Sequence, residues 1–165
     1  MPMITLIEQL AHQVGEQFKS HGLKLITAES CTGGGLAYAI TSIPGSSIWF
    51  DRGLVTYSNR SKEELLGVNP ETLAAFGSVS AEVAQEMAEG ALHHGPAQIS
   101  IALTGIAGPD GGTLDKPVGT VWIACASKTA ATQVTHYLFT GERALVREKS
   151  IETALQILSS RLQQF

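Results

Sequence analysis

The sequence predicts an α/β fold, a three-layer α/β/α sandwich around a mixed sheet of about five strands. Apolar, strand-like segments alternate with segments of helical periodicity along most of the chain, which is typical of strands joined by helical crossovers. Two strand-like segments follow one another near the end, which predicts a hairpin and hence a mixed sheet. With 165 residues, 44% apolar and 16% charged, the chain fits one compact domain, which we expect to span residues 1–165.

Six segments have apolar residues at helical spacing or capping residues at their ends, which is typical of helices. Gly22 is placed to stop the first of them. The fourth has Asn69 as N-cap, Pro70 at the first helical position and Gly77 as stop. Ser80 opens the fifth. The expected helices cover residues 1–20, 36–43, 58–67, 69–77, 81–94 and 143–162.

Five segments are apolar and rich in β-branched or aromatic residues, which is typical of strands. The segment 98–104 has the strongest strand pattern, and a short link joins the last two segments. Fifteen residues with five glycines and two prolines follow 98–104, a long irregular loop of the kind that usually carries function. The expected strands cover residues 23–28, 52–57, 98–104, 120–127 and 131–140.

The formal net charge of -4 and the pI near 5.7 argue against polyanionic partners. Nucleic acids and anionic membranes attract clustered Lys and Arg, so we expect neither as a partner. A small phosphorylated ligand remains compatible, because a few backbone N–H groups and one cation hold a phosphate whatever the overall charge. No basic, apolar leader and no long apolar run is present, so we expect a cytoplasmic protein.

The common cofactor and metal motifs are absent from the sequence. There is no Gly-Lys-Ser/Thr phosphate loop, no G-x-G-x-x-G pattern, no lipase G-x-S-x-G and no Ser-x-x-Lys. Cys31 and Cys125 lack the paired spacing of a zinc site. His93 and His94 have no glutamate at the spacing of a zinc protease. We therefore expect no metal and no organic cofactor.

Reactive side chains follow three of the expected strands. They are Ser30, the stretch from Tyr57 to Lys62, and the stretch from Thr104 to Gly112. In open α/β sheets, ligands bind at the carboxyl ends of strands. We therefore expect these three places to meet in one site.

Ser30, in the stretch TAESCTGGG, is a candidate nucleophile. It precedes a helix N-terminus, where the backbone N–H groups of Thr32 to Gly34 would hold an oxyanion. Gly33 and Gly34 lack a Cβ, so a substrate could approach the main chain closely. Two alternatives remain open: Ser30 or Thr32 is only a helix N-cap, or Cys31 is the nucleophile because a helix N-terminus lowers a thiol pKa.

A serine nucleophile needs a base, and no histidine ends a strand near Ser30. Lys62 would fill this role if burial left it as a free amine, whereas a solvated helix lysine is the plainer interpretation. Tyr57 could orient Lys62 or relay its proton, although a tyrosine at a strand end often only packs.

Two further features are candidate ligand contacts. Gly105 and Gly108 let the chain turn tightly against a ligand after Thr104, although a threonine there is also simply a good strand residue. Arg143 and Arg147 lie one turn apart near a helix N-terminus, where two cations oppose the helix dipole. A phosphate or carboxylate ligand would relieve that conflict, and placement on the surface is the plainer alternative.

Several motifs in a fixed order resemble those of one family. TAESCTGG, PGSS, VTYSN followed by Lys62, VS at 79–80, TGIAGPDGG and KPVGTVW closely resemble the CinA C-terminal domain family, over about residues 5–160. The resemblance implies hydrolysis of the carboxamide of nicotinamide mononucleotide to nicotinate mononucleotide and ammonia, without a cofactor, by a homodimer. It implies the following site residues: Ser30 as nucleophile, Lys62 as base, Tyr57 as helper, and Thr104, Gly105, Ala107 and Gly108 shaping the pocket.

The implied reaction is an acyl transfer. Ser30 attacks the carboxamide carbonyl, the amides of Thr32 to Gly34 hold the oxyanion, and Lys62 passes a proton to the departing ammonia. Arg143 is a candidate contact for the nucleotide substrate. Two alternatives remain: the same amidase with Cys31 as nucleophile, and a catalytically silent module that only binds a nucleotide.

Overall fold

The structure, a computed structural model, describes residues 4–165, so residues 1–3 of the expected first helix lie outside the described part. Within residues 4–165 the strands are β1 (Leu25–Glu29), β2 (Phe50–Val55), β3 (Ile99–Gly105), β4 (Thr120–Ser127) and β5 (Gln133–Leu138). The helices are α1 (Leu6–His21), α2 (Gly35–Thr41), α3 (Asn59–Leu66), α4 (Pro70–Phe76), α5 (Ala81–Ala91) and α6 (Arg143–Leu162), with the 3-10 helices η1 (Ser46–Ile48) and η2 (Leu92–His94).

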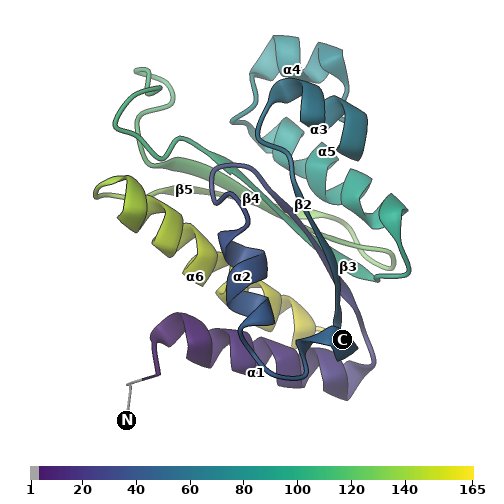
Figure 1. The fold of residues 1–165 in the computed structure, drawn as a ribbon. Helices are drawn as coiled ribbons and strands as arrows, with labels where there is room; N and C mark the ends of the chain where they lie inside the picture. The colour runs from purple at the N-terminus through teal and green to yellow at the C-terminus, as the bar shows by residue number, and fades with distance from the viewer. Residues whose placement is uncertain (1–3) are drawn as a thin grey trace.

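The predicted sandwich is confirmed. One five-stranded sheet, in the order β2-β1-β3-β4-β5, separates two layers of helices. Helices α1, α2 and α6 cover one face, and α3, α4 and α5 lie over the other (Figure 1). The sheet is mixed because β1 pairs in parallel with β2 and β3, whereas β4 is antiparallel to both β3 and β5.

The topology determines where a ligand would bind. The connection after β1 passes through α2 and runs toward the β2 edge of the sheet. The connection after β3 leads to β4 and runs toward the β5 edge. Because β1, β2 and β3 are parallel, their carboxyl ends share one edge of the sheet. The crevice between two strands whose connections diverge is the usual ligand site of such sheets.

The two central parallel strands are buried on both faces. All of β1 and all but the last residue of β3 are buried, whereas the edge strands β2 and β5 are half-exposed. Helices on both sides of the sheet explain this burial. Among the helices within residues 4–165, none combines the length and the apolar character that a membrane crossing requires.

Most helix boundaries were predictable from capping residues, whereas the ends of the first two strands were not. Asn69 and Ser80 are N-caps, Gly22 is a C-cap, and α6 has the predicted bounds. The first two strands, expected at 23–28 and 52–57, lie at Leu25–Glu29 and Phe50–Val55 instead. Pairing of β1 with both neighbours determines these ends, and local residue preference does not report pairing. The shift places Glu29 inside β1 and Tyr57 beyond β2.

Candidate active site

The carboxyl ends of β1, β2 and β3 open into one cavity of about 260 Å³. This volume is small among ligand cavities and suits a small molecule better than a polymer. All three places predicted from the strand ends contribute to it, which confirms that they meet. The lining residues are Ser30, Cys31, Tyr57, Lys62, Ser78, Val79, Thr104, Gly105, Ile106, Ala107, Gly108, Asp110, Gly111 and Arg143.

Ser30 and Lys62 are in direct contact at the bottom of this cavity. The Nζ of Lys62 lies 3.0 Å from the Oγ of Ser30. The same Nζ donates to the backbone carbonyls of Thr56, at 2.7 Å, and Tyr57, at 3.3 Å. Lys62 is only 1% exposed, so the interpretation of it as a solvated helix lysine is wrong.

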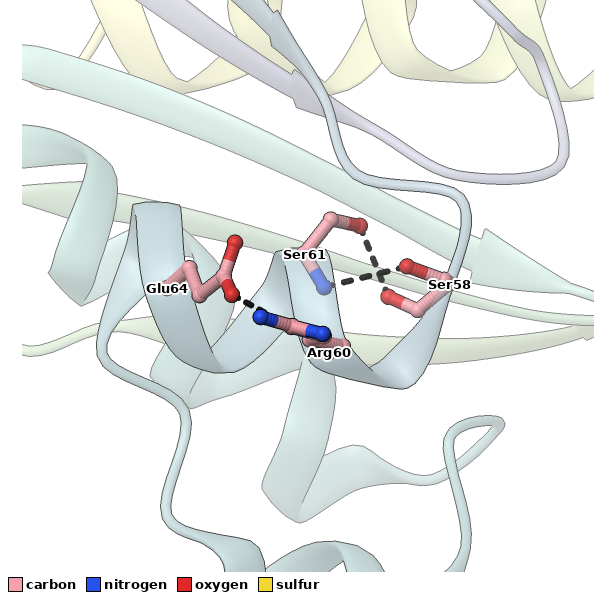
Figure 2. Close-up of polar contacts among 4 residues, drawn as sticks. All are labelled: Ser58, Arg60, Ser61 and Glu64. Atoms are coloured by element: carbon pink, nitrogen blue, oxygen red, sulfur yellow. Dashed lines mark hydrogen bonds and ion pairs between the residues drawn. The ribbon is translucent and has the colours of Figure 1, made fainter.

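The first turn of α3 explains why Lys62 points inward. The side chain of Ser58 accepts a hydrogen bond from the amide of Ser61, and the Ser61 hydroxyl donates to the Ser58 carbonyl (Figure 2). On the outer face, Arg60 and Glu64 form an ion pair at 2.6 Å (Figure 2). Lys62 is two positions from each of them, about 200° around the helix, and therefore faces the sheet.

Burial lowers the pKa of Lys62 from its ordinary 10.5 to about 8. Removing an ammonium group from water disfavours its charged form, and the two carbonyls that contact Nζ only partly replace that water. A lysine with this pKa is a free amine in a sizeable fraction of molecules near neutral pH. That property is what a general base requires.

Cys31 also lines the cavity, and burial favours the neutral form of its thiol, which is not the nucleophilic form. Burial raises the pKa of its thiol to about 11, an effect that its own backbone N–H partly offsets. Its Sγ packs against Gly105, where an added Cβ would lie 3.2 Å from the sulfur. The expectation that a helix N-terminus lowers this pKa is wrong, because the thiol is 6% exposed and the helix amides are used elsewhere.

Glu29, which the sequence reasoning overlooked, uses those helix amides. Its buried carboxylate accepts from the amides of Leu36, at 2.8 Å, and Ala37, at 3.1 Å, the second and third residues of α2. It also accepts from the hydroxyl of Thr32 at 2.6 Å. Thr32 is therefore neither an N-cap nor a cavity residue. A glutamate at the end of a buried strand was the available signal.

The glycine-rich turn is arranged differently from the prediction. The amide of Gly33 donates to the carbonyl of Ser30 at 3.0 Å, so it is not free for an oxyanion. Thr32, Gly33 and Gly34 are not among the lining residues of the cavity within residues 4–165. Gly33 and Gly34 have φ of 58° and 98°, so glycine is needed there for the turn itself.

Arg143 and Tyr57 form the rim of the cavity. Arg143 donates to the carbonyl of Gly108 at 2.7 Å and to the phenol oxygen of Tyr57 at 3.1 Å. The Tyr57 side chain is 63% exposed, and only its backbone carbonyl contacts Lys62. The phenol is thus placed beside Arg143, not where it would orient the lysine. In the cavity wall, buried Thr104 donates to the carbonyl of Ser78 at 2.8 Å.

The structure separates the two arginines that the sequence paired. Arg147 donates to the carbonyls of Cys31 and Thr32, both at 3.2 Å, and is not a lining residue of the cavity. It holds the turn after β1 from the side of α6. Only Arg143 faces the cavity.

The histidines lie away from the cavity. His94 contacts the carbonyl of Leu65, and the ring of His136 packs at a tilt against Trp122 with 4.6 Å between ring centroids. None of the five lines the cavity. Within residues 4–165, no three His, Cys, Asp or Glu side chains are grouped so that they could hold a metal ion.

Comparisons with known proteins identify the family of the chain. The family model of the CinA C-terminal domain matches residues 7–162. Nicotinamide-nucleotide amidohydrolase PncC of Escherichia coli K12 is 50% identical over 150 residues, 91% of each chain. A CinA-like protein of Geobacter sulfurreducens is 52% identical over 149 residues, 90% of this chain but 36% of that longer protein. The crystal structure of the competence/damage inducible protein CihA from Agrobacterium tumefaciens superposes with a TM-score of 0.94 at 42% identity, covering 99% of both chains. The chain belongs to the CinA C-terminal domain family.

Proposed function

We propose that this protein is a nicotinamide-nucleotide amidohydrolase, which converts nicotinamide mononucleotide to nicotinate mononucleotide and ammonia. The observation that carries the proposal is the 3.0 Å contact between the Oγ of Ser30 and a buried lysine at the bottom of a small cavity. Relatives at 50% identity with that name support the choice of substrate.

Lys62 acts as the base in its neutral form. A neutral amine has two hydrogens and one lone pair. The carbonyls of Thr56 and Tyr57 accept the two hydrogens, which leaves the lone pair for the hydroxyl proton of Ser30. These backbone acceptors therefore orient the amine as well as bury it.

The reaction proceeds by two acyl transfers. The Oγ of Ser30 attacks the carboxamide carbon while its proton passes to the Nζ of Lys62. When the C–N bond breaks, Lys62 returns that proton to the leaving nitrogen and ammonia departs, leaving an ester on Ser30. A water molecule then attacks the ester carbon, again giving a proton to Lys62. The proton returns to Ser30 as nicotinate mononucleotide leaves.

The oxyanion of each tetrahedral intermediate is assigned to the amide of Cys31. This amide follows the nucleophile directly, which is a common position for such a donor in serine hydrolases. Cys31 lines the cavity, and no oxygen acceptor within residues 4–165 takes its N–H. This assignment replaces the predicted one to Thr32, Gly33 and Gly34.

Arg143 recognises the phosphate of the nucleotide from the rim. Its contacts with Gly108 and Tyr57 leave other guanidinium N–H groups free, and planar N–H pairs bind phosphate oxygens well. Thr104, Gly105, Ala107 and Gly108 form the wall between the rim and Ser30.

Ammonia release by the purified protein tests the proposal. Nicotinamide mononucleotide should be hydrolysed, whereas the riboside and free nicotinamide should react much more slowly because they lack the phosphate. Equal rates for the mononucleotide and the riboside would contradict the phosphate contact. Tight binding of the mononucleotide without ammonia release would indicate a binding module instead.

A further inference from the structure

Glu29 is buried beside the proposed nucleophile, yet it touches neither Ser30 Oγ nor the cavity. It is the last residue of β1, and it is 1% exposed. Its backbone is held on both sides, because it pairs with Val55 and Leu103 in the sheet. The backbone of Glu29 is thus fixed in the sheet, and its carboxylate can hold the turn that follows through hydrogen bonds.

All four N-terminal amides of α2 are satisfied, two of them by this carboxylate. Leu36 and Ala37 donate to Glu29, Gly35 donates to the Thr32 carbonyl, and Tyr38 donates to the Gly34 carbonyl. The N-cap residue of α2 is a glycine with no side-chain cap. Glu29, five residues before this N-cap, accepts the hydrogen bonds that a capping side chain would accept, and the favourable interaction of a carboxylate with a helix N-terminus strengthens them.

The turn between Glu29 and α2, residues 30–34, is called the Ser30 turn here, and hydrogen bonds hold it from two sides. The Thr32 hydroxyl donates to Glu29 at 2.6 Å, while Arg147 donates to the carbonyls of Cys31 and Thr32. The Ser30 amide is bonded to the Leu103 carbonyl at 3.0 Å. In a trans peptide the C=O and N–H point in opposite directions. The Cys31 amide shares its peptide with the Ser30 carbonyl, which accepts from the Gly33 amide at 3.0 Å. That bond therefore determines where the Cys31 amide points, while the bond to Leu103 holds the backbone of Ser30.

We propose that Glu29 is a positioning residue for the acyl transfer: its carboxylate ties the Ser30 turn to α2 and thereby holds Ser30 Oγ against Lys62 Nζ. The inference rests on the proposed function for its choice of substrate but not for its geometry. A nucleophile displaced by about 1 Å loses on the order of 10²-fold in rate, so loosening this tie slows chemistry without changing the cavity wall.

The decisive variants are Glu29→Gln and Thr32→Val. Glu29→Gln keeps the shape but places an NH₂ donor where an acceptor is needed, and we expect kcat to fall about 10- to 100-fold with KM within about twofold. Thr32→Val removes only one of the three hydrogen bonds, and a loss of about 3- to 10-fold is expected. Glu29→Asp keeps the charge on a shorter side chain and should recover part of the activity lost in Glu29→Gln.

Thr41→Val is the matched control. Thr41 also lies on α2, and its hydroxyl donates to the carbonyls of Ala37 and Tyr38, away from the Ser30 turn. We expect its kcat and KM to equal those of the unchanged protein. A loss in Thr41→Val as large as that in Thr32→Val would mean that α2 stability, not the Ser30 turn, is what matters, and would overturn the proposal.

Reactivity of Ser30 toward a sulfonyl fluoride gives a readout that does not depend on the substrate. Ser30 Oγ bonds to sulfur, fluoride leaves, and Lys62 takes the proton, so the rate constant reports the Ser30–Lys62 geometry per folded molecule. It should fall in Glu29→Gln in parallel with kcat. The proposal would be overturned if Glu29→Gln had the same sulfonylation rate constant as the unchanged protein and the same kcat per reactive serine. If the unchanged protein releases no ammonia from nicotinamide mononucleotide, the proposed function fails, while the sulfonylation rates still test Glu29.

Discussion

The floor of the cavity and its rim are held in different ways. On the floor, Ser30 and Lys62 are 7% and 1% exposed, and their polar atoms bond to one another or to backbone carbonyls. On the rim, Tyr57 is 63% exposed, and Arg143 contacts only that side chain and one loop carbonyl. The floor thus has a fixed, desolvated geometry that suits chemistry, whereas the rim suits recognition. Floor variants should lower kcat, and rim variants should raise KM.

Ser30→Ala should have the largest effect. Loss of the nucleophile is expected to lower kcat/KM at least about 10⁴-fold, as in other covalent hydrolases. Ammonia release from nicotinamide mononucleotide measures it. Cys31→Ala is the matched variant, and it should stay within a few-fold because the Cys31 thiol is buried with a raised pKa. Activity that survives in Ser30→Ala and disappears in Cys31→Ala would make Cys31 the nucleophile.

Lys62→Met should come next. A base contributes about 10²- to 10⁴-fold, and methionine fills similar volume without a lone pair that can take the proton. We expect that loss in kcat with little change in KM. Lys149→Met serves as control, since Lys149 is half-exposed, does not line the cavity and contacts the Thr140 carbonyl. A large rise in KM for Lys62→Met, with kcat preserved, would mean that Lys62 binds the substrate and does not act as the base.

The pH dependence sharpens the role of Lys62. Its pKa is lowered to about 8 and the free amine is the active form, so kcat/KM should rise about tenfold per pH unit below that value and level off above it. The folded state binds this proton more weakly than the unfolded chain. Lys62 therefore lowers stability below about pH 8, and the penalty disappears as pH rises toward 10.5. Initial rates between pH 6 and pH 10 and denaturation midpoints at both ends measure the two effects. A flat rate profile would exclude a titrating lysine base.

Arg143→Ala should have the smallest of these effects. Loss of one exposed phosphate contact is expected to raise KM about tenfold, which corresponds to about 1.4 kcal/mol, with kcat nearly unchanged. Steady-state kinetics with the mononucleotide and the riboside measure it, and the riboside should be insensitive. Arg60→Ala, on the outer face of α3 (Figure 2), is the control for loss of one cation. An equal rise in KM for both substrates would show that Arg143 does not contact the phosphate.

Much of the fold and part of the site could be predicted because the signals are local. Caps at Asn69 and Ser80 and the apolar central strands determined the element order. Parallel strands then brought Ser30, Lys62 and Thr104 to one edge. The arrangement of the glycine-rich turn could not be predicted, because residue types do not show which backbone amides already have an acceptor, as the Gly33 amide has in the Ser30 carbonyl.

The sequence by itself determined the α/β/α sandwich, the order of its elements and the reactive residues at the strand ends, because periodicity, caps and strand composition act over a few residues. Only the tertiary structure decided which of those residues are buried and what they contact. It lowered the pKa of Lys62, left Cys31 a packed thiol, and separated Arg143 from Arg147. It also gave the amides of α2 to Glu29. The physical reason is that desolvation and hydrogen-bond partnership depend on segments distant in the chain.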